Sequence, residues 1–257
     1  MRVLVTRPPR QAADWVARLR RLGLDAAALP LIGIAEVEDP APLQAAWATL
    51  AARSLVVFVS PNAVEHFFAR RAPAQAWPAA TLAGSTGPGT SAALRAAGLG
   101  EAQLVEPGVD APSFDSEALW ARLAGRDWGG RSVLVVRGED GREWLSQTLR
   151  ARGARVDFVA AYRRLPPLLD AAGAALLAAA LADPAAHLWL FSSSEALRHL
   201  QALAPGAAWG GSRAAASHPR IVQSARELGF GRVDALAPDP EAVAALLRRT
   251  PIQSPPQ

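Results

Sequence analysis

The sequence predicts an α/β protein of two similar small parallel-sheet domains that face each other across a cleft. The first observation is a duplication. Residues 3–7 (VLVTR) and a helix pattern ending at Gly23 return, at an offset of 130, as residues 133–137 (VLVVR) and a helix pattern ending at Gly153. The second observation is that residues 58–64 recur as residues 191–197 at an offset of 133. A repeat of this length indicates a duplicated domain, because solenoid repeats are several times shorter.

The third observation is that strand and amphipathic-helix patterns alternate within each half, which is typical of a parallel sheet covered by helices. The loops repeat as well, since residues 87–90 (GPGT) are echoed by residues 218–221 (HPRI) at an offset of 131. Each half is therefore expected to build the same fold from the same succession of strand, loop and helix.

The first elements follow from hydrophobic spacing and from helix-stop residues. Residues 3–6 form a predicted buried strand, and residues 11–22 a helix with Trp15 and Leu19 on one face. Residues 29–34 form a second extended segment. The charged, proline-containing residues 36–42 mark a first crossing between the domains.

A helix is expected from Leu43, followed by a strand over residues 55–59, a loop at 60–62 and a helix through Phe67. A short strand over residues 81–83 leads into the glycine-rich turn 84–89. A helix over residues 90–97 follows this turn and ends before a glycine.

In the remainder of the chain, Ser116 is the predicted N-cap of a helix over residues 117–123. Residues 156–165 are extended and end at the prolines 166–167, which mark a second crossing between the domains. The alanine-rich residues 171–182 favour a helix. Residues 251–257 are expected to be a disordered tail.

Composition narrows the possible functions. The chain has 257 residues, enough for two domains of ordinary size, and 51% of them are hydrophobic against 19% charged. Cysteine is absent, which excludes disulfides, thiolate metal sites and a cysteine nucleophile. The four histidines are scattered, so we expect no metal site.

No stretch reaches the roughly 20 predominantly apolar residues that cross a bilayer, and the N-terminus passes directly into a strand. We therefore expect no membrane span and no signal peptide, and a cytoplasmic protein. The protein is also expected to be a monomer.

All 27 basic residues are arginines, and the net charge is +4. The absence of lysine excludes a lysine Schiff base. Nucleic acid is not an expected partner, because no dense basic cluster with interleaved aromatic residues is present. Spaced arginines suit an anionic small molecule, since a guanidinium binds a carboxylate through two parallel hydrogen bonds. Most of the arginines are nevertheless expected to be solvated surface residues.

In open α/β sheets, ligands bind beyond the carboxyl ends of the strands. The polar residues that follow predicted strands, and are therefore candidate binding residues, are Arg7, Ser60, Asn62, Thr90, Arg137, Ser193, Ser194 and Ser217. Serine, threonine and asparagine are also favoured at these positions by turn and helix-cap chemistry alone. Capping therefore stands beside ligand binding as an explanation of each hydroxyl.

The glycine-rich turn at residues 84–90 is a candidate anion site, because backbone N–H groups at such a turn and at a helix N-terminus bind phosphate or carboxylate. It lacks the lysine of a Walker loop and the spacing of a dinucleotide fingerprint. It is somewhat similar to the phosphate loop of a flavodoxin, which keeps a flavin-binding electron carrier as one hypothesis. A flavodoxin loop, however, follows the first strand, and here that strand ends in residues 6–9 (TRPP).

Tyr162 is the only tyrosine of the chain, and it stands beside Arg163 and Arg164 close to the second crossing. A phenol in that place is a candidate proton donor to a leaving oxygen. The alternative is a strand tyrosine with a packed ring and a solvated hydroxyl.

Together, several motifs resemble the uroporphyrinogen-III synthase family: residues 4–8 (LVTRP), 30–32 (PLI), 57–64 (VFVSPNAV), 87–90 (GPGT) and 137–142 (RGEDGR). Residues 161–164 (AYRR) and 191–193 (FSS) extend the match to nearly the whole chain. The resemblance implies a discontinuous first domain of residues 1–36 and 166–250 and a second domain of residues 37–165, joined by two extended crossings.

The resemblance also implies a reaction without cofactor or metal, in the biosynthesis of haem. Hydroxymethylbilane, a linear tetrapyrrole bearing many carboxylates, loses water and cyclises to uroporphyrinogen III with inversion of ring D. In the usual scheme, loss of the terminal hydroxyl gives an azafulvene, which the substituted carbon of the last ring attacks to form a spiro intermediate. By resemblance, Tyr162 is the candidate proton donor, and Ser60 and Thr90 bind substrate carboxylates together with backbone amides at residues 60–62 and 193–195.

Residues 218–221 depart from the Gly-Pro-Thr-Thr-like loop that the family often carries in its second half, so Ser217 or Arg220 would replace those hydroxyl contacts. The main alternative from another class is a non-catalytic two-domain protein that binds an anionic small molecule. It would keep the arginines and show no turnover.

Overall fold

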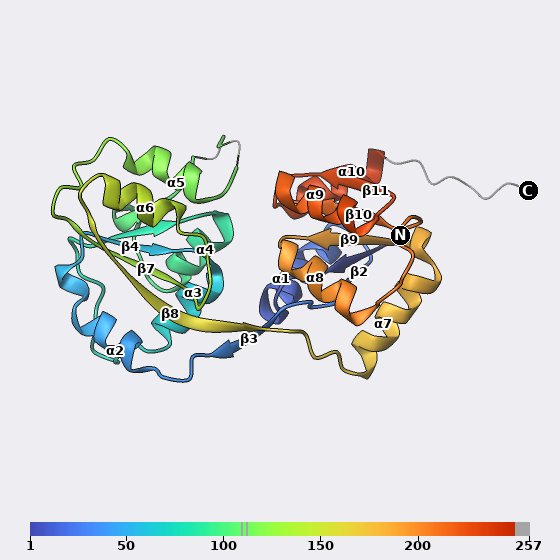
Figure 1. The fold of residues 1–257 in the computed structure, drawn as a ribbon, viewed down its shortest axis with the longest axis horizontal. Coiled ribbons are helices and arrows are strands. Elements are labelled where there is room, and N and C mark those ends of the chain that lie inside the picture. The colour runs from blue at the N-terminus through green and yellow to red at the C-terminus, as the bar shows by residue number, and fades with distance from the viewer. Residues whose placement is uncertain (109, 112, 250–257) are drawn as a thin grey trace, which may run out of the picture. The chain divides into compact units, whose positions relative to one another are not determined.

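The computed structural model describes residues 1–108, 110–111 and 113–249. The chain divides into two compact units (Figure 1). The first unit joins Met1–Ile34 with the residues from Leu165 onward, and the second unit is Ala35–Arg164. Each unit contains a predominantly parallel β-sheet with helices on both faces, which confirms the predicted α/β class.

The sheet of the first unit has β1 near its centre, and its paired strands are parallel. The strand order is β11 (Arg232–Ala235), β10 (Arg213–Ala216), β9 (His187–Phe191), β1 (Arg2–Val5) and β2 (Ala26–Ala28). One face is covered by α7 (Ala171–Ala182), α8 (Ser194–Leu203) and α9 (Pro219–Leu228). The other face is covered by α1 (Pro9–Arg21) and α10 (Pro240–Arg249). A short 3₁₀ turn, Pro184–Ala186, precedes β9.

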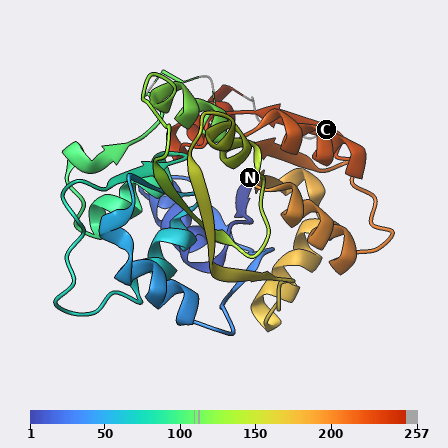
Figure 2. The same ribbon diagram turned by 60° about the vertical axis from the view of Figure 1, so that its left-hand side comes forward.

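The sheet of the second unit has the order β3 (Gly33–Glu36), β8 (Arg155–Leu165), β7 (Ser132–Gly138), β4 (Leu55–Phe58), β5 (Leu82–Ser85) and β6 (Leu104–Val105). Its helices are α2 (Ala41–Ala48), α3 (Pro61–Phe68), α4 (Pro88–Ala96), α5 (Ser116–Leu123) and α6 (Trp144–Ala151), with 3₁₀ turns at Leu50–Ala52 and Glu101–Gln103. The two connections between the units are β3 and the end of β8, the long olive strand of Figures 1 and 2.

The duplication is visible in the sheets themselves. Offsets of 129 to 133 map the order β11-β10-β9-β1-β2 of the first unit onto β6-β5-β4-β7-β8 of the second unit. The equivalent strands occur in a different order along the chain, because β7 and β8 come last in the second unit whereas β1 and β2 come first in the first unit. The two sheets are therefore related like circular permutants of one another.

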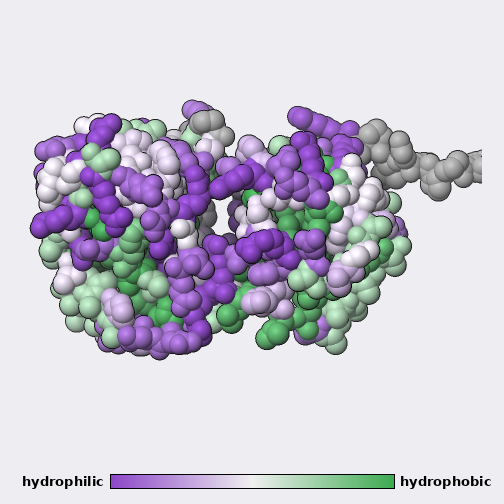
Figure 3. All heavy atoms as spheres, in the orientation of Figure 1, coloured by the Kyte–Doolittle hydropathy of each residue, from purple (hydrophilic) through white to green (hydrophobic). Residues whose placement is uncertain are grey.

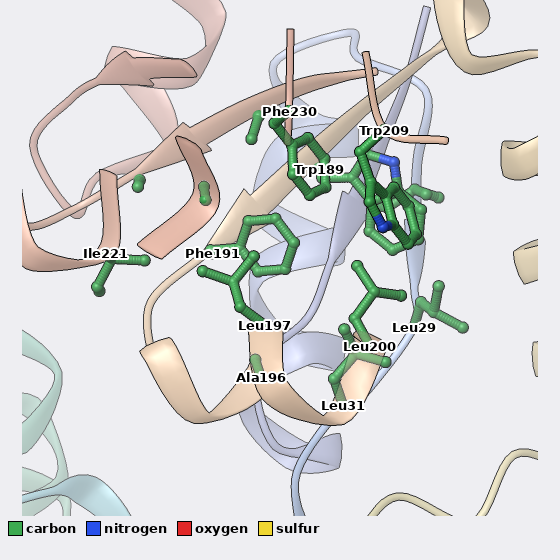
Figure 4. Close-up of a cluster of buried hydrophobic side chains, with 14 of the residues drawn as sticks. Leu29, Leu31, Trp189, Phe191, Ala196, Leu197, Leu200, Trp209, Ile221 and Phe230 are labelled. Atoms are coloured by element: carbon green, nitrogen blue, oxygen red, sulfur yellow. The ribbon is translucent and has the colours of Figure 1, made fainter. Parts of the chain in front are cut away.

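The cores form because the strands are buried on both faces and alternate residues point to opposite sides. In the first unit, Leu4 and Trp189 face the α7, α8 and α9 side, while Val3 faces α1. Figure 4 shows the aromatic part of the first of these clusters. The rings of Trp209 and Phe230 stack with centroids 5.1 Å apart, and Trp189 meets Trp209 edge-on at 5.7 Å. Large aromatic side chains contribute much of the apolar area that stabilises such a core.

Some sequence predictions of local structure were wrong. Ser116 is not the N-cap of α5, because Asp115 precedes it and its carboxylate accepts a hydrogen bond from the Ala118 N–H at 2.9 Å. The predicted extended segment at residues 29–34 is only partly a strand: β2 ends at Ala28 and β3 begins at Gly33. Between them the chain still follows β1, because the N–H groups of Leu29 and Leu31 donate to the carbonyl oxygens of Val5 and Thr6 at 3.0 and 3.3 Å.

The predicted turn at residues 84–89 is shorter than expected, because Gly84 and Ser85 belong to β5. The predicted tail at residues 251–257 lies outside the described residues. No helix in the described part of the chain has the length and apolarity needed to span a membrane. On the face drawn in Figure 3, hydrophilic side chains are distributed over both units.

Candidate functional site

Two helix N-termini meet at the carboxyl edge of the sheet in the second unit. Strand β4 leads through Ser60 into α3, and β5 leads through Gly87 into α4. A Cβ added to Gly89 would lie 3.5 Å from Cγ of Pro61, so the two loops are in contact. The hydroxyl of Thr86 ties them further by donating to the carbonyl oxygen of Val59 at 3.2 Å. Backbone N–H groups that converge in this way favour an anion.

The predicted residues Ser60, Asn62 and Thr90 all belong to these two loops. Ser60 caps α3 through its Oγ, which accepts from the Ala63 N–H at 3.2 Å. Asn62 and Thr90 lie in the first turns of α3 and α4, and both are buried. No side chain caps α4; its first residue, Pro88, has no N–H, and the Thr90 N–H donates to the Gly87 carbonyl oxygen at 3.0 Å.

Tyr162 is brought to this cluster by β8. Its hydroxyl lies 3.0 Å from Oγ of Ser60 and accepts from Nη2 of Arg164 at 3.4 Å. Its ring packs on Gly138, where an added Cβ would come within 3.3 Å of the ring, and it stacks on His66 at 5.9 Å between centroids. Tyr162 has an exposed fraction of 0%. The alternative of a packed ring with a solvated hydroxyl is therefore wrong, because the hydroxyl is enclosed together with the ring.

His66 is part of the same cluster, and the sequence reasoning did not include it among the candidates. Burial lowers its pKa, and the charge of Arg70 lowers it further, against the opposing effect of Glu36 and Glu65. The imidazole next to Tyr162 is therefore neutral around neutral pH. The recurrence of histidine at positions 66 and 199 in both halves was the available signal.

We expect the free energy of unfolding to fall as the pH is lowered through the ordinary histidine pKa of 6.5, because His66 takes up its proton less readily in the folded than in the unfolded chain. His66→Phe keeps an aromatic ring on Tyr162 and removes this contribution. Urea unfolding of both proteins between about pH 7 and pH 5 measures it. A difference in stability between the two proteins that does not vary with pH would contradict the assignment.

Arg137 occupies the same edge of the sheet but a different face. Residues alternate along β7, so Arg137 shares a face with Val135, whereas Gly138 faces Tyr162. The Arg137 guanidinium lies over the ring of Phe158 at 4.3 Å and donates to the carbonyl oxygen of Gly141 at 3.3 Å. The structure therefore does not bring Arg137 together with the Ser60–Tyr162 pair.

In the first unit, the predicted residues follow the neighbouring strands β1, β9 and β10. Ser193 caps α8 by accepting from the Glu195 N–H at 3.1 Å. The hydroxyl of Ser194 lies 3.1 Å from that of Ser224 on α9. Ser217 precedes α9, whose cap is the ring of His218. Capping therefore accounts for Ser193, as the alternative reading of the sequence allowed.

Arg7 is the most unusual charge of this edge. Its guanidinium lies over the ring of Trp15 at 4.4 Å, and its Nε is buried without a hydrogen-bond partner among the described residues. Burial, with the nearby charge of Arg18, lowers the pKa of Arg7 to about 10. No carboxylate in the described part of the chain forms an ion pair with it, so the site presents an uncompensated cation.

Known proteins of one family resemble this chain over most of its length. The family model of uroporphyrinogen-III synthase HemD matches residues 13–245. The uroporphyrinogen-III synthase of Salmonella typhimurium is 33% identical over 178 residues, which are 68% of this chain and 70% of that protein. The Escherichia coli K12 enzyme is 32% identical over 179 residues, with 68% and 70% covered.

This chain belongs to the uroporphyrinogen-III synthase family. Two solved structures have the same fold: a mutant uroporphyrinogen III synthase of Thermus thermophilus and the uroporphyrinogen-III synthetase of Helicobacter pylori. Both have a TM-score of 0.58, at 21% and 16% identity, over 96% of this chain and 96% and 99% of theirs. The resemblance read from the short motifs is confirmed.

In this member of the uroporphyrinogen-III synthase family, the predicted site residues fall into separate groups. The second unit gathers Ser60, Asn62, Thr90 and Tyr162, and the first unit places Arg7, Ser193, Ser194 and Ser217 at the ends of adjacent strands. Within the described residues, no three histidine, aspartate or glutamate side chains are grouped as metal ligands would be.

Proposed function

We propose that this protein acts as the synthase of its family, converting hydroxymethylbilane into uroporphyrinogen III with loss of water and inversion of ring D. The observation that carries the proposal is the family match over residues 13–245, which includes the carboxyl strand ends of both units except that of β1. Non-catalytic binding of an anion is the alternative, and the synthase relatives do not favour it.

The substrate is rich in carboxylates, and the site residues suit it. Arg7 has no acidic partner in the described chain, and a carboxylate would supply the missing charge through parallel hydrogen bonds. The adjoining N-termini of α3 and α4, with Ser60, Asn62 and Thr90, offer N–H and hydroxyl donors to a second carboxylate. Ser193, Ser194 and Ser217 are proposed to do the same in the first unit.

Most of the catalysis is then positioning, because the last pyrrole ring must be held so that its substituted carbon attacks the azafulvene. Tyr162 is proposed as the source of the proton that leaves with the hydroxyl. We further propose that the protein acts as a cytoplasmic monomer without cofactor, nucleic acid or membrane partner.

The direct test is an isomer assay. Purified protein is incubated with hydroxymethylbilane, the products are oxidised, and the type I and type III isomers are separated. We expect mainly type III, whereas a parallel sample of heat-denatured protein should give the spontaneous type I product. Only type I from the native protein would overturn the proposal and leave the anion-binding protein as the better hypothesis.

A further inference from the structure

The hydrogen bonds around Tyr162 have a defined direction. Arg164 has donors only, so the phenol oxygen accepts at the 3.4 Å contact with its Nη2. The hydroxyl is enclosed, and among the described residues Ser60 Oγ, at 3.0 Å, is its remaining partner. A buried donor needs an acceptor, so the proton of Tyr162 points at Ser60.

Ser60 is then saturated as an acceptor and free as a donor. Its Oγ accepts from Tyr162 and from the Ala63 N–H, which uses both lone pairs of a hydroxyl. Its own proton has no acceptor among the described residues. Ser60 is only half-buried, whereas Tyr162 is fully buried.

We infer that Ser60 is the catalytic residue that gives its proton to the departing hydroxyl, and that Tyr162 is a positioning residue that orients Ser60 and restores its proton. This inference deepens the proposed function and rests on it. The aligned contacts Arg164 to Tyr162 to Ser60 carry it, since a phenol with no exposed surface does not touch a substrate directly.

The internal repeat indicates that only the second unit can carry this proton transfer. At the offset of 130, the residue of the first unit that corresponds to Tyr162 is Ile32, which has no proton to give. Ser193 repeats Ser60 as a helix cap at the offset of 133, and its hydroxyl therefore lacks a phenol at the corresponding position. The duplicated fold thus has a serine cap in each unit, and of the two only Ser60 has a phenol beside it that can supply a proton.

The proton balance closes over one turnover. As the C–O bond of the terminal hydroxyl breaks, the oxygen keeps the bonding electrons, takes the Ser60 proton and leaves as water. Ser60 takes the proton of Tyr162, and the resulting phenolate faces the Arg164 guanidinium. After the new C–C bond closes the macrocycle, the proton that the ring must lose returns by the same path and restores Tyr162.

The test is a double-mutant cycle on kcat for type III product, with Ser60→Ala, Tyr162→Phe and the double variant. A relay predicts a loss of about tenfold or more in each single variant and little further loss in the double variant, because either change breaks the same path. KM should change much less than kcat, and Ser60→Thr, which keeps the hydroxyl, should restore most of kcat. Asp170→Ala, which removes the cap of α7, controls for loss of a cap and should leave kcat unchanged.

If the wild type makes type III while Ser60→Ala keeps kcat within about twofold, or the two losses multiply in the double variant, the relay is overturned and the synthase proposal stands. A wild type that makes only type I overturns both. If Ser60→Ala does not fold, NMR of wild-type protein labelled at Cζ of its single tyrosine decides. Separate protonated and deuterated resonances in mixed H₂O and D₂O support the enclosed hydrogen bond, and one averaged resonance contradicts it.

Discussion

Gly231→Ala is expected to lower the free energy of unfolding by about 3 kcal/mol. An added Cβ would overlap the carbonyl oxygen of Gly210 and lie 2.9 Å from its carbonyl carbon. These are backbone atoms, so no side-chain rotation relieves the overlap, and the segment before β11 must shift. The shift would strain the Gly231 N–H to Trp209 hydrogen bond, which is 3.3 Å long, and disturb the stack of Trp209 on Phe230.

Urea unfolding measures this loss, and the chain offers a matched control in Gly210→Ala. A Cβ at Gly210 meets no atom within 4 Å, and its φ is not in the left-handed region. We expect that variant to stay within about 0.5 kcal/mol of the wild type. Equal stability of the two variants would show that the close approach at Gly231 does not constrain the fold.

Arg7→Met is expected to raise KM for hydroxymethylbilane by roughly 10- to 100-fold, the effect of losing a hydrogen-bonded charge pair. The same variant is expected to be at least as stable as the wild type. The folded state holds Arg7 with a pKa of about 10, below its ordinary value of 12.5, so the charged form is disfavoured by folding at neutral pH. Methionine keeps apolar contact with Trp15 and removes the unpaired charge.

Steady-state kinetics and thermal unfolding of the same preparation separate the two effects. The control is Arg2→Met at the opposite end of β1, where the exposed Arg2 pairs with Asp25 at 3.0 Å. It should leave KM unchanged. A less stable Arg7→Met with unaltered KM would assign Arg7 a purely structural role.

The fold was largely predictable because its signals are local and repeated. The buried strand at residues 3–5 and its copy at 133–135 carry the same apolar pattern, and a helix follows each. The errors concern where an element begins or ends, as at the start of α5. Asp115, not Ser116, is the N-cap of α5. Aspartate and serine are similarly favoured as N-caps, so the sequence pattern alone does not show at which of the two residues the helical backbone begins.

The site was predictable in its types of residue but not in its contacts. Strand ends identified Ser60, since such positions share one edge of a sheet. Tyr162 was chosen instead as the only tyrosine of the chain, beside Arg163 and Arg164. Their mutual hydrogen bond and the burial of Tyr162 depend on Gly138, which leaves room for the ring, and on the stacking of His66. Arg137 illustrates the limit: its place at a strand end was read correctly, but the alternation of the strand turns it to the other face.

The pairing of β1 with β9 also bears on how the chain folds during its synthesis. Arg2 leaves the ribosome among the first residues, yet its partner across the sheet, His187, is made only after the whole of the second unit. The contiguous second unit can therefore fold first, since domains generally fold as units during translation. Until β9 emerges, the apolar strand β1 has one unpaired edge, which is a hazard for aggregation of the nascent chain. Slow translation before residue 187 would prolong that exposure, and chaperone demand should be concentrated in this interval.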